Sequence, residues 1–398
     1  MFKSKFFIGC MVSIIFAGMS SPGFSQLAPE VQLGARGVIS FNLDDLSNNN
    51  SSQVNDFSDT SLLIGFGQKL YSSYRGQLVI GFQFPDADSD LGQVYFHQVF
   101  MKIEDKTNIL KIGRSRVRSS LIEFPTLRDD DAIYFTDVLN PFSSGENTEE
   151  SQYGNVFELA HIFRQRYRLR IHGEHFTETP VPPATAETDF DINSLGISFD
   201  YCVPESQQWN RNILNQIGIG FNSFRTDRPG YSGEADRALK NITFSTILNL
   251  KPDPVHFWDL RHQNIYNMGF GEVNQVRTYN DMTRAKSISS FTSLRYLYRK
   301  LERPATQLSA SFGYKAFPDL SNSAGQQQYV INGFYRIGSN FDAGMQVQHS
   351  KFEGDLKDIL GRSELRVQFA LVFSVNMLWN NQFDSRDSLL NLEHGYIP

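Results

Sequence analysis

Cysteine is scarce in this sequence, and the scarcity excludes a fold held by internal disulfides. The 398 residues contain two cysteines, Cys10 and Cys202. Cys10 falls in an N-terminal segment that we expect to be removed, which leaves Cys202 alone, and one thiol cannot form an internal disulfide. A nearly cysteine-free chain that is exported is consistent with the periplasm or beyond.

Long apolar runs are also missing beyond the first 26 residues. Hydrophobic residues make up 40% of the chain and its mean hydropathy is -0.34. A transmembrane helix needs about 20 consecutive apolar residues, so a helical membrane protein is excluded. The mature chain is expected to be soluble or to cross a membrane as a closed β-barrel.

The N-terminus has the organisation of a secretory signal peptide, predicted at residues 1–26. Lys3 and Lys5 precede the apolar run FFIGCMVSIIFAGM, and SSPGFSQ supplies small residues for cleavage. The motif FIGC resembles a lipoprotein box around Cys10, but the apolar run continues past it. Removal of this segment changes the net charge from -6 to about -8. This acidic balance argues against a nucleic-acid partner.

Helical periodicity is scarce, whereas alternation with period two recurs along the chain. Near the C-terminus one face would carry Val367, Phe369, Leu371, Phe373, Val375, Met377 and Trp379, and the other Arg366, Gln368, Ala370, Val372, Ser374 and Asn376. That length suits a tilted strand that crosses a bilayer. About sixteen strands are predicted, at residues 31–44, 60–71, 76–85, 92–104, 107–118, 154–163, 165–178, 190–203, 213–225, 240–251, 255–268, 287–300, 306–316, 327–337, 341–352 and 363–379.

The connections between these strands alternate between long and short. Long polar segments such as DDLSNNNSSQVNDFSD alternate with tight ones such as RQR and KPDP. The three tryptophans, Trp209, Trp258 and Trp379, fall at strand ends next to the shorter connections, where an aromatic belt would meet the membrane surface. We predict an all-β, antiparallel, up-and-down transmembrane barrel over residues 27–383, followed by a periplasmic tail at 384–398.

At this point the sequence resembles a known family. A signal peptide, about sixteen strands and an unusually long connection after the fifth strand are similar to the Gram-negative general porins. The resemblance implies an outer-membrane location among lipid and lipopolysaccharide, and a homotrimer. It also implies a third outer loop that folds into the barrel and narrows a water-filled pore for small hydrophilic solutes.

The long fifth connection, from about Ser119 to Tyr153, contains the carboxylates of LRDDDAIYFTDVLNP. Thr126 is a candidate N-cap for a short helix that ends before Pro141. The four acidic side chains, Asp129, Asp130, Asp131 and Asp137, are our candidates for the pore constriction. The alternative is that these aspartates only cap the helix in solvent.

A basic segment, QRYRLRIHGEH, provides candidate partners for that loop on the barrel wall. Arg166, Arg168 and Arg170 alternate with apolar residues, so lipid-facing apolar side chains would place the arginines in the lumen. A guanidinium on the lipid face would cost about 2–4 kcal/mol near the midplane. We expect the three arginines and the loop carboxylates to set the charge selectivity of the pore.

Catalysis and metal binding find little support in the sequence. Three consecutive aspartates lack the alternating spacing and the glycine of a calcium loop, and no G-x-S-x-G elbow or H-E-x-x-H pair is present. We expect no enzyme, cofactor or metal. The leading hypothesis is a porin for passive diffusion. The alternatives are a channel selective for an anion such as a carboxylate or phosphate, and a non-conducting adhesive or structural barrel.

Overall fold

The computed structural model describes residues 30–44, 52–56, 61–70, 74–83, 95–116, 153–178, 190–203, 213–226, 239–251, 253–269, 285–300, 303–318, 324–337, 341–354, 356–357 and 363–379. Nearly all of these residues lie in strands or in the turns that join them. No helix within these ranges is both long enough and apolar enough to cross a membrane. The expected signal peptide at 1–26 and the tail at 384–398 lie outside the described residues.

Seventeen strands form one antiparallel sheet. In chain order they are β1 (Glu30–Asp44), β2 (Ser52–Asp56), β3 (Ser61–Lys69), β4 (Arg75–Gln83), β5 (Tyr95–Glu104), β6 (Asn108–Arg116), β7 (Tyr153–Phe163), β8 (Tyr167–Glu178) and β9 (Phe190–Cys202). They continue with β10 (Leu214–Thr226), β11 (Leu239–Lys251), β12 (His256–Asn267), β13 (Ser287–Lys300), β14 (Arg303–Ala316), β15 (Gly325–Arg336), β16 (Phe341–Glu353) and β17 (Ser363–Trp379).

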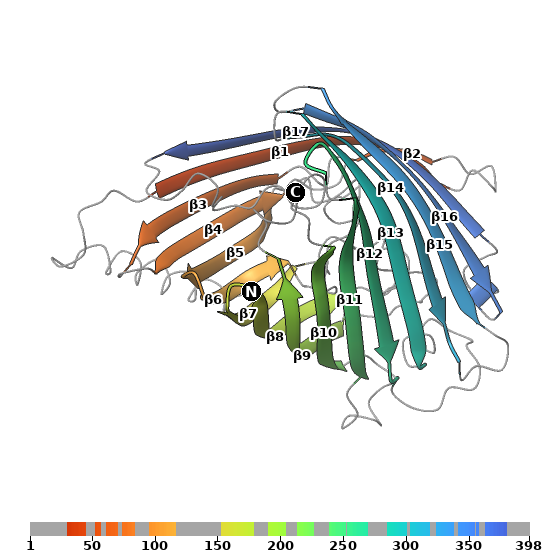
Figure 1. Cartoon of the computed structure of the whole chain (residues 1–398), viewed down its shortest axis with the longest axis horizontal. Coiled ribbons are helices and arrows are strands. Elements are labelled where there is room, and N and C mark those ends of the chain that lie inside the picture. Colours follow the sequence, from red (N-terminus) through yellow and green to blue (C-terminus); the bar gives the residue numbers. More distant parts are fainter. Residues whose placement is uncertain are drawn as a thin grey trace.

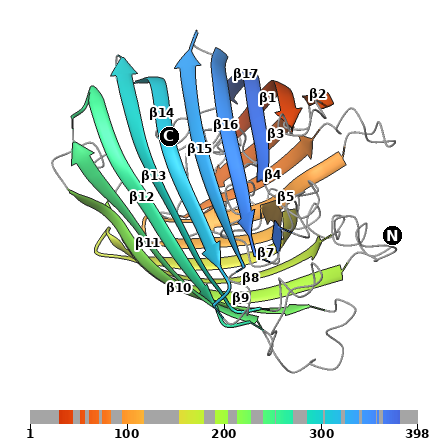
Figure 2. The same ribbon diagram turned by 90° about the vertical axis from the view of Figure 1, so that its right-hand side faces the viewer.

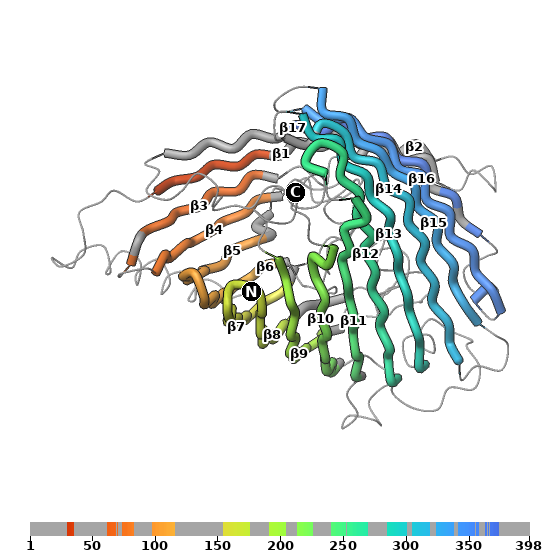
Figure 3. The backbone as a smooth tube through the Cα atoms, viewed as in Figure 1, coloured from red at the N-terminus to blue at the C-terminus, as the bar shows by residue number. Residues whose placement is uncertain are grey.

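The sheet closes on itself through its first and last strands. β1 pairs with β17 from Val31 opposite Trp379 to Asp44 opposite Arg366, and on its other side it pairs with β3 and β2. Figure 1 shows β1 between β17 and β3 at this seam, and Figure 3 traces the strands around the wall. Closure satisfies the backbone groups that an open sheet would leave exposed at its edges.

β2 is a strand that the sequence analysis did not predict. It pairs with Ser40–Asp44, the second half of β1, while β3 pairs with the first half, Glu30–Arg36. β2 and β3 therefore lie end to end beside β1 and together occupy one strand position in the wall. The seventeen strands form a sixteen-stranded barrel. The polar sequence SQVND shows no alternation, and we predicted it as part of a loop. The fold class and the positions of the other strands are confirmed within a few residues.

Short and long connections fall on opposite ends of the barrel. The β7–β8 hairpin has three residues between its strands, Arg164 to Arg166. Arg164 and Gln165 have φ of 50° and 61°, and the Arg166 N–H donates to the Phe163 carbonyl. Two central residues with positive φ match the right-handed twist of the flanking strands. Because successive strands are antiparallel, the strand ends that the shorter connections join lie at the end of the barrel where β1 begins and β17 finishes. Figure 2 shows the strands from the side.

Two of the short turns are held by aspartate side chains. The Asp105 carboxylate accepts hydrogen bonds from the N–H groups of Thr107 and Asn108, at 2.7 and 2.6 Å. In the β11–β12 turn, Asp253 accepts from the N–H groups of Val255 and His256, at 2.8 and 3.2 Å. These backbone hydrogen bonds lower the pKa of both carboxyl groups from the ordinary value of 3.8.

Acid should weaken these turns. Because the folded-state pKa of each aspartate is depressed, its contribution to stability is fully present above the ordinary value and is lost as the pH falls through the folded-state value. We expect the urea midpoint of unfolding to fall between about pH 5 and about pH 2. The double substitution Asp105→Asn and Asp253→Asn should lower the midpoint at neutral pH and make the acid dependence shallower. An unchanged acid dependence in the double variant would contradict this account.

Candidate functional site

The barrel has a polar interior and an apolar exterior. Along β9, Ser194, Ser198 and Asp200 are buried, while the alternating Ile197 and Phe199 are exposed by 46% and 45%. The same inversion runs around the wall, with exposed Phe157, Ile219, Ile331, Leu371 and others on the outside, and buried Gln77, Glu158, Gln263, Ser293, Gln328, Gln346 and others on the inside. A soluble protein buries its apolar side chains; this arrangement is that of a barrel that spans a membrane around a polar lumen.

Aromatic residues gather near both ends of the outer wall. At the short-turn end, the ring centroids of Trp258 and Tyr296 are 4.9 Å apart. Tyr167 stacks on Phe199 with ring centroids 6.1 Å apart. Toward the long-loop end, Tyr266, Tyr314 and Tyr329 are exposed by 40%, 38% and 46%. Two such belts mark the positions of the membrane surfaces. Trp258 confirms the placement predicted for it, and Trp379 is the last residue of β17; Trp209 lies outside the described residues.

The first charged cluster of the inner wall lies on β7, β8 and β9. The Arg168 guanidinium donates to both oxygens of Asp200 through Nε, at 3.1 Å, and to Oδ2 through Nη2, at 2.8 Å. Two residues further along β8, Arg170 forms an ion pair with Glu158, with 3.0 Å between Nε and Oε1. The wall thus supplies its own carboxylates to the two arginines.

The other predicted site residues divide into two groups. Arg166 lies in the β7–β8 turn, and its Nη1 donates to the hydroxyl of Tyr201, which is on the outer face of β9. It therefore sits at the rim, apart from Arg168 and Arg170 on the inner wall. The loop carboxylates Asp129, Asp130, Asp131 and Asp137 lie outside the described residues, so their place relative to the lumen remains a prediction.

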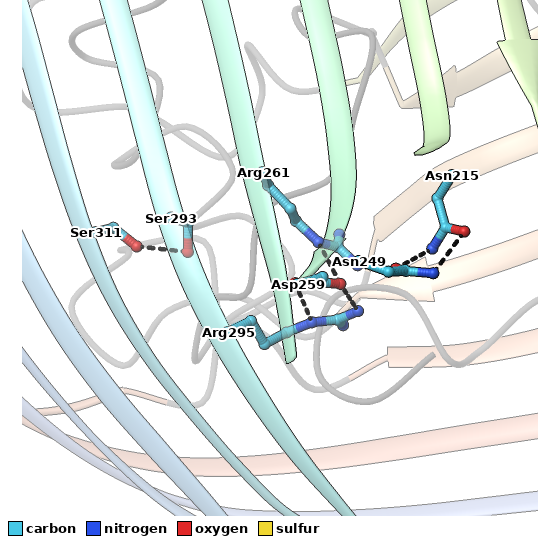
Figure 4. Close-up of polar contacts among 7 residues, drawn as sticks. All are labelled: Asn215, Asn249, Asp259, Arg261, Ser293, Arg295 and Ser311. Atoms are coloured by element: carbon cyan, nitrogen blue, oxygen red, sulfur yellow. Dashed lines mark hydrogen bonds and ion pairs between the residues drawn. The ribbon is translucent and has the colours of Figure 1, made fainter. Parts of the chain in front are cut away.

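The second charged cluster joins β12 and β13. Asp259 lies between two arginines: Arg295 donates through Nη2 at 2.6 Å and through Nε at 3.2 Å, and the Nε of Arg261 is 3.5 Å from Oδ2 (Figure 4). The three side chains are between 1% and 9% exposed. Both guanidinium groups therefore lie within ion-pair distance of the same carboxylate.

A third cluster lies at the short-turn end of β1, β4 and β5. The Arg75 Nη2 donates to Glu30 at 3.2 Å. On the same part of the wall, Gln77 donates to Glu104 at 2.7 Å, and Lys102 forms an ion pair with Glu104. Every one of these charges has an opposite charge beside it, which lowers the cost of placing them on the barrel wall.

Neutral amide and hydroxyl groups cover much of the remaining inner wall. Asn249 donates to Asn215 at 2.8 Å and Ser311 donates to Ser293 at 2.9 Å, as Figure 4 shows. On β16 and β17, Gln346 donates to Gln368 at 3.1 Å. These groups can donate and accept hydrogen bonds, so they suit water or hydrophilic solutes without a preference for either sign of charge.

Apolar side chains interrupt this polar lining, and two groups of them pack together. Ile265, Phe291 and Val330 pack together on β12, β13 and β15, and Leu63 packs with Val79 on β3 and β4. All five are buried. Among the described residues no group of three or more His, Cys, Asp or Glu side chains could hold a metal ion.

The members of the lining clusters that were not predicted from the sequence include Glu158, Asp200, Asp259 and Arg295. Arg168 and Asp200 are 32 residues apart, and Asp259 and Arg295 are 36 apart. Each of them is buried on the inner face of its strand and alternates there with outer-face residues. Which inner-face residues meet depends on the register between strands, and alternation does not supply that.

The comparisons with known proteins support this architecture at the level of the fold. No protein-family model matches the sequence, and no curated protein matches it. The outer membrane channel DcaP of Acinetobacter baumannii matches with a TM-score of 0.57 at 12% identity, over 89% of this chain and 99% of that one. The chain has the fold of the outer-membrane porins.

Two further solved structures have a similar fold. OmpT, an outer membrane protein of Vibrio cholerae, matches with a TM-score of 0.52 at 9% identity, over 88% of this chain and 99% of that one. An anion-selective porin from Comamonas acidovorans matches with a TM-score of 0.51 at 8% identity, over 87% and 98% of the two chains. At these identities the likeness extends to the porin fold, and the selectivity of each neighbour is its own.

Proposed function

We propose that the chain forms a water-filled channel in a bacterial outer membrane through which small hydrophilic solutes diffuse passively. The observation that carries this proposal is the inversion of the wall, with buried polar groups such as Gln263 and Ser293 inside and exposed Ile219 and Ile331 outside. A closed barrel with an apolar band and a polar lumen matches the architecture of a diffusion channel. The work is done by pore width and lining charge, so no catalytic residue is needed.

The test is electrical. Purified protein in a planar bilayer should open steps of constant conductance, and proteoliposomes that contain it should swell in solutions of small sugars. A barrel that binds a partner through its outer loops, or that only has a structural role, would give neither signal. Absence of conductance together with absence of swelling would overturn the proposal.

A second proposal is that the channel prefers anions such as carboxylates or phosphates. The supporting observation is the Asp259 cluster, where one carboxylate lies between the buried guanidinium groups of Arg261 and Arg295. Asp129, Asp130, Asp131 and Asp137 at a constriction would oppose this preference by adding negative charge to the pore. The zero-current potential in a salt gradient distinguishes the two cases by its sign.

Arg168→Ala should shift the selectivity of the channel toward cations. One charge about 8 Å from a passing ion contributes about 0.5 kcal/mol in water, which corresponds to roughly a two-fold change in the permeability ratio. The measurement is the zero-current potential across a bilayer in a tenfold salt gradient. Arg166→Ala is the matched control, because Arg166 lies in the turn against Tyr201 and should leave the potential unchanged. Equal shifts in both variants would remove Arg168 from the selectivity filter.

The porin resemblance adds three elements to the proposal: export through a cleaved signal peptide at 1–26, an outer surface in contact with lipid and lipopolysaccharide, and assembly as a homotrimer. The apolar band between the aromatic belts supports the contact with lipid. N-terminal sequencing of the mature protein and its mass in mild detergent test the other two.

A further inference from the structure

A row of apolar side chains lies on the inner wall at the short-turn end of the barrel. It consists of Phe257 on β12, Leu297 on β13 and Phe334 on β15, with the amide of Gln307 on β14 between the last two. Strand register makes each member the direct cross-strand neighbour of the next. Phe257 is the second residue of β12, directly after the β11–β12 turn. We call these four residues the mouth row.

The mouth row is covered as completely as a protein core. Its four side chains are between 0% and 2% exposed, whereas Leu308 and Tyr335, on the outer face of the same strands, are exposed by 51% and 61%. A sixteen-stranded wall encloses a lumen wide enough for water, and apolar side chains are disfavoured beside water. The row therefore requires an apolar cover on its lumen side.

Gln307 indicates which kind of group suits the row. Within the part of the chain that the structure describes, neither its Nε2 nor its Oε1 atom has a hydrogen-bond partner, although the side chain is 0% exposed. A buried amide without partners is costly. Its amide donates and accepts side by side, as a peptide group does, so an extended backbone over the row can pair with both atoms. Apolar cover together with peptide hydrogen bonds fits a polypeptide segment better than a small solute.

The C-terminal segment begins at the same end of the barrel as the mouth row. β17 finishes at Trp379, which is opposite Val31 near the start of β1. Register aligns the row with Ala370 on β17 through Gly344 on β16. Ala370 is nine residues before Trp379, so the row is about 30–40 Å from the end of β17, at about 3.3 Å per residue and about 4.8 Å per strand. The nineteen residues after Trp379 can span about 60 Å when extended.

The sequence of that segment supplies the groups that the row requires. Its large apolar residues beyond position 384 are Leu389, Leu390, Leu392, Tyr396 and Ile397. In an extended segment Leu390 and Leu392 point to the same side. Other segments are less well placed: residues 27–29, which precede β1 after the expected cleavage, are too few to reach the row, and the long connections begin at the opposite end of the barrel.

We propose that the segment 384–398 lies inside the lumen at the short-turn end, with Leu390 and Leu392 packed on the mouth row and its backbone paired with Gln307. The row is then a docking site for the chain's own C-terminal segment. The tail that the sequence places in the periplasm narrows the channel from that side, independently of the long connection at 119–152. The polar wall around Gln77, at the same end on β4, stays open to solutes.

Cysteine cross-linking in the full-length chain tests this contact. The background carries Cys202→Ser, because Cys202 is the one cysteine outside the expected signal peptide. Ser309→Cys lies beside the row on the inner face of β14 and leaves the row intact. Combined with Leu390→Cys, it should give an intramolecular product with a short thiol-specific cross-linker in outer-membrane vesicles, detected as a joined peptide pair by mass spectrometry. The matched control is Gln77→Cys with Leu390→Cys, which should give no product.

A charge on the docked side of the segment should release it. Leu392→Asp should reduce the product that joins positions 309 and 390 at least ten-fold, because an ionised carboxylate is disfavoured against buried apolar side chains. The single-channel conductance should rise in the same variant. Asn391→Asp adds the same charge one residue away, on the side that faces the lumen, and should leave both the product and the conductance unchanged.

Each other outcome contradicts the proposed contact. Equal cross-linking of position 390 to positions 309 and 77, or an unchanged product in Leu392→Asp, would show that the segment does not dock on the mouth row. Cross-linking of position 309 to Phe135→Cys, but not to position 390, would identify the connection at 119–152 as the cover. If Leu392→Asp does not fold, the comparison of the cysteine pairs still decides. The cross-link needs no current, so absence of conductance would count against the channel proposal alone.

Discussion

Replacing Asp259 with alanine is expected to destabilise the folded barrel by about 3–5 kcal/mol, the usual cost of removing one partner from a buried ion pair. Asp259 is 1% exposed and lies between Arg295, at 2.6 Å, and Arg261, at 3.5 Å. Without the carboxylate, two like charges remain together on the barrel wall. Urea unfolding of the protein in lipid vesicles, followed by tryptophan fluorescence, measures the loss.

Two further variants test whether the loss in Asp259→Ala comes from the buried ion pair. Asp259→Ala combined with Arg295→Met should recover part of the loss, because a buried ion pair can often be replaced by apolar groups with little net cost. Glu353→Ala should change the midpoint little, because the Lys351–Glu353 pair is exposed by 52% and 40%. A small effect of Asp259→Ala, similar to that of Glu353→Ala, would show that the Asp259 cluster is hydrated and contributes little to stability.

The second large effect is expected on the outer wall. Ile197→Lys should destabilise the barrel by about 2–4 kcal/mol, the cost of a lysine near the bilayer midplane. Ile197 is in the middle of β9 and is 46% exposed on the outer face. Folding into lipid vesicles in the presence of urea, with the reversible midpoint as the readout, measures this cost directly.

The control for this prediction is a lysine on the other face of the same strand. Ser194 is on the inner wall and donates to Glu174 at 3.0 Å, so Ser194→Lys places its ammonium group beside a carboxylate. Its effect should be much smaller than that of Ile197→Lys. Comparable losses in the two variants would contradict the assignment of the inner and outer faces on which the channel proposal depends.

Much of this fold follows from local sequence patterns. The alternation Val367, Phe369, Leu371 and Phe373 predicts the outer face of β17, and Phe369, Leu371 and Phe373 are exposed there as expected. Strand alternation and the spacing of turns are local properties, because side chains point to opposite faces at successive residues whatever the partner strand is. For that reason the strand positions, the alternation of long and short connections and the two faces could be predicted.

The candidate site was less accessible from sequence. Arg168 and Arg170 could be assigned to the inner face by alternation, but Asp200 and Glu158, which pair with them, could not be recognised as their partners. Arg166 shows the limit at a strand end: the same alternation placed it with the other two, whereas it lies in the three-residue β7–β8 turn at the rim. Alternation predicts the face of a side chain only within an extended strand, and it no longer does so in a turn.

The sequence by itself therefore determined the number and length of most strands, their two faces and the order of long and short connections. Only the tertiary structure decided how the barrel closes, that β2 and β3 occupy one strand position beside β1, and which charged side chains pair across strands. The physical reason is the distance along the sequence over which each interaction acts. Side-chain alternation is set within two residues, whereas register and closure depend on hydrogen bonds and side-chain pairs between segments tens to hundreds of residues apart.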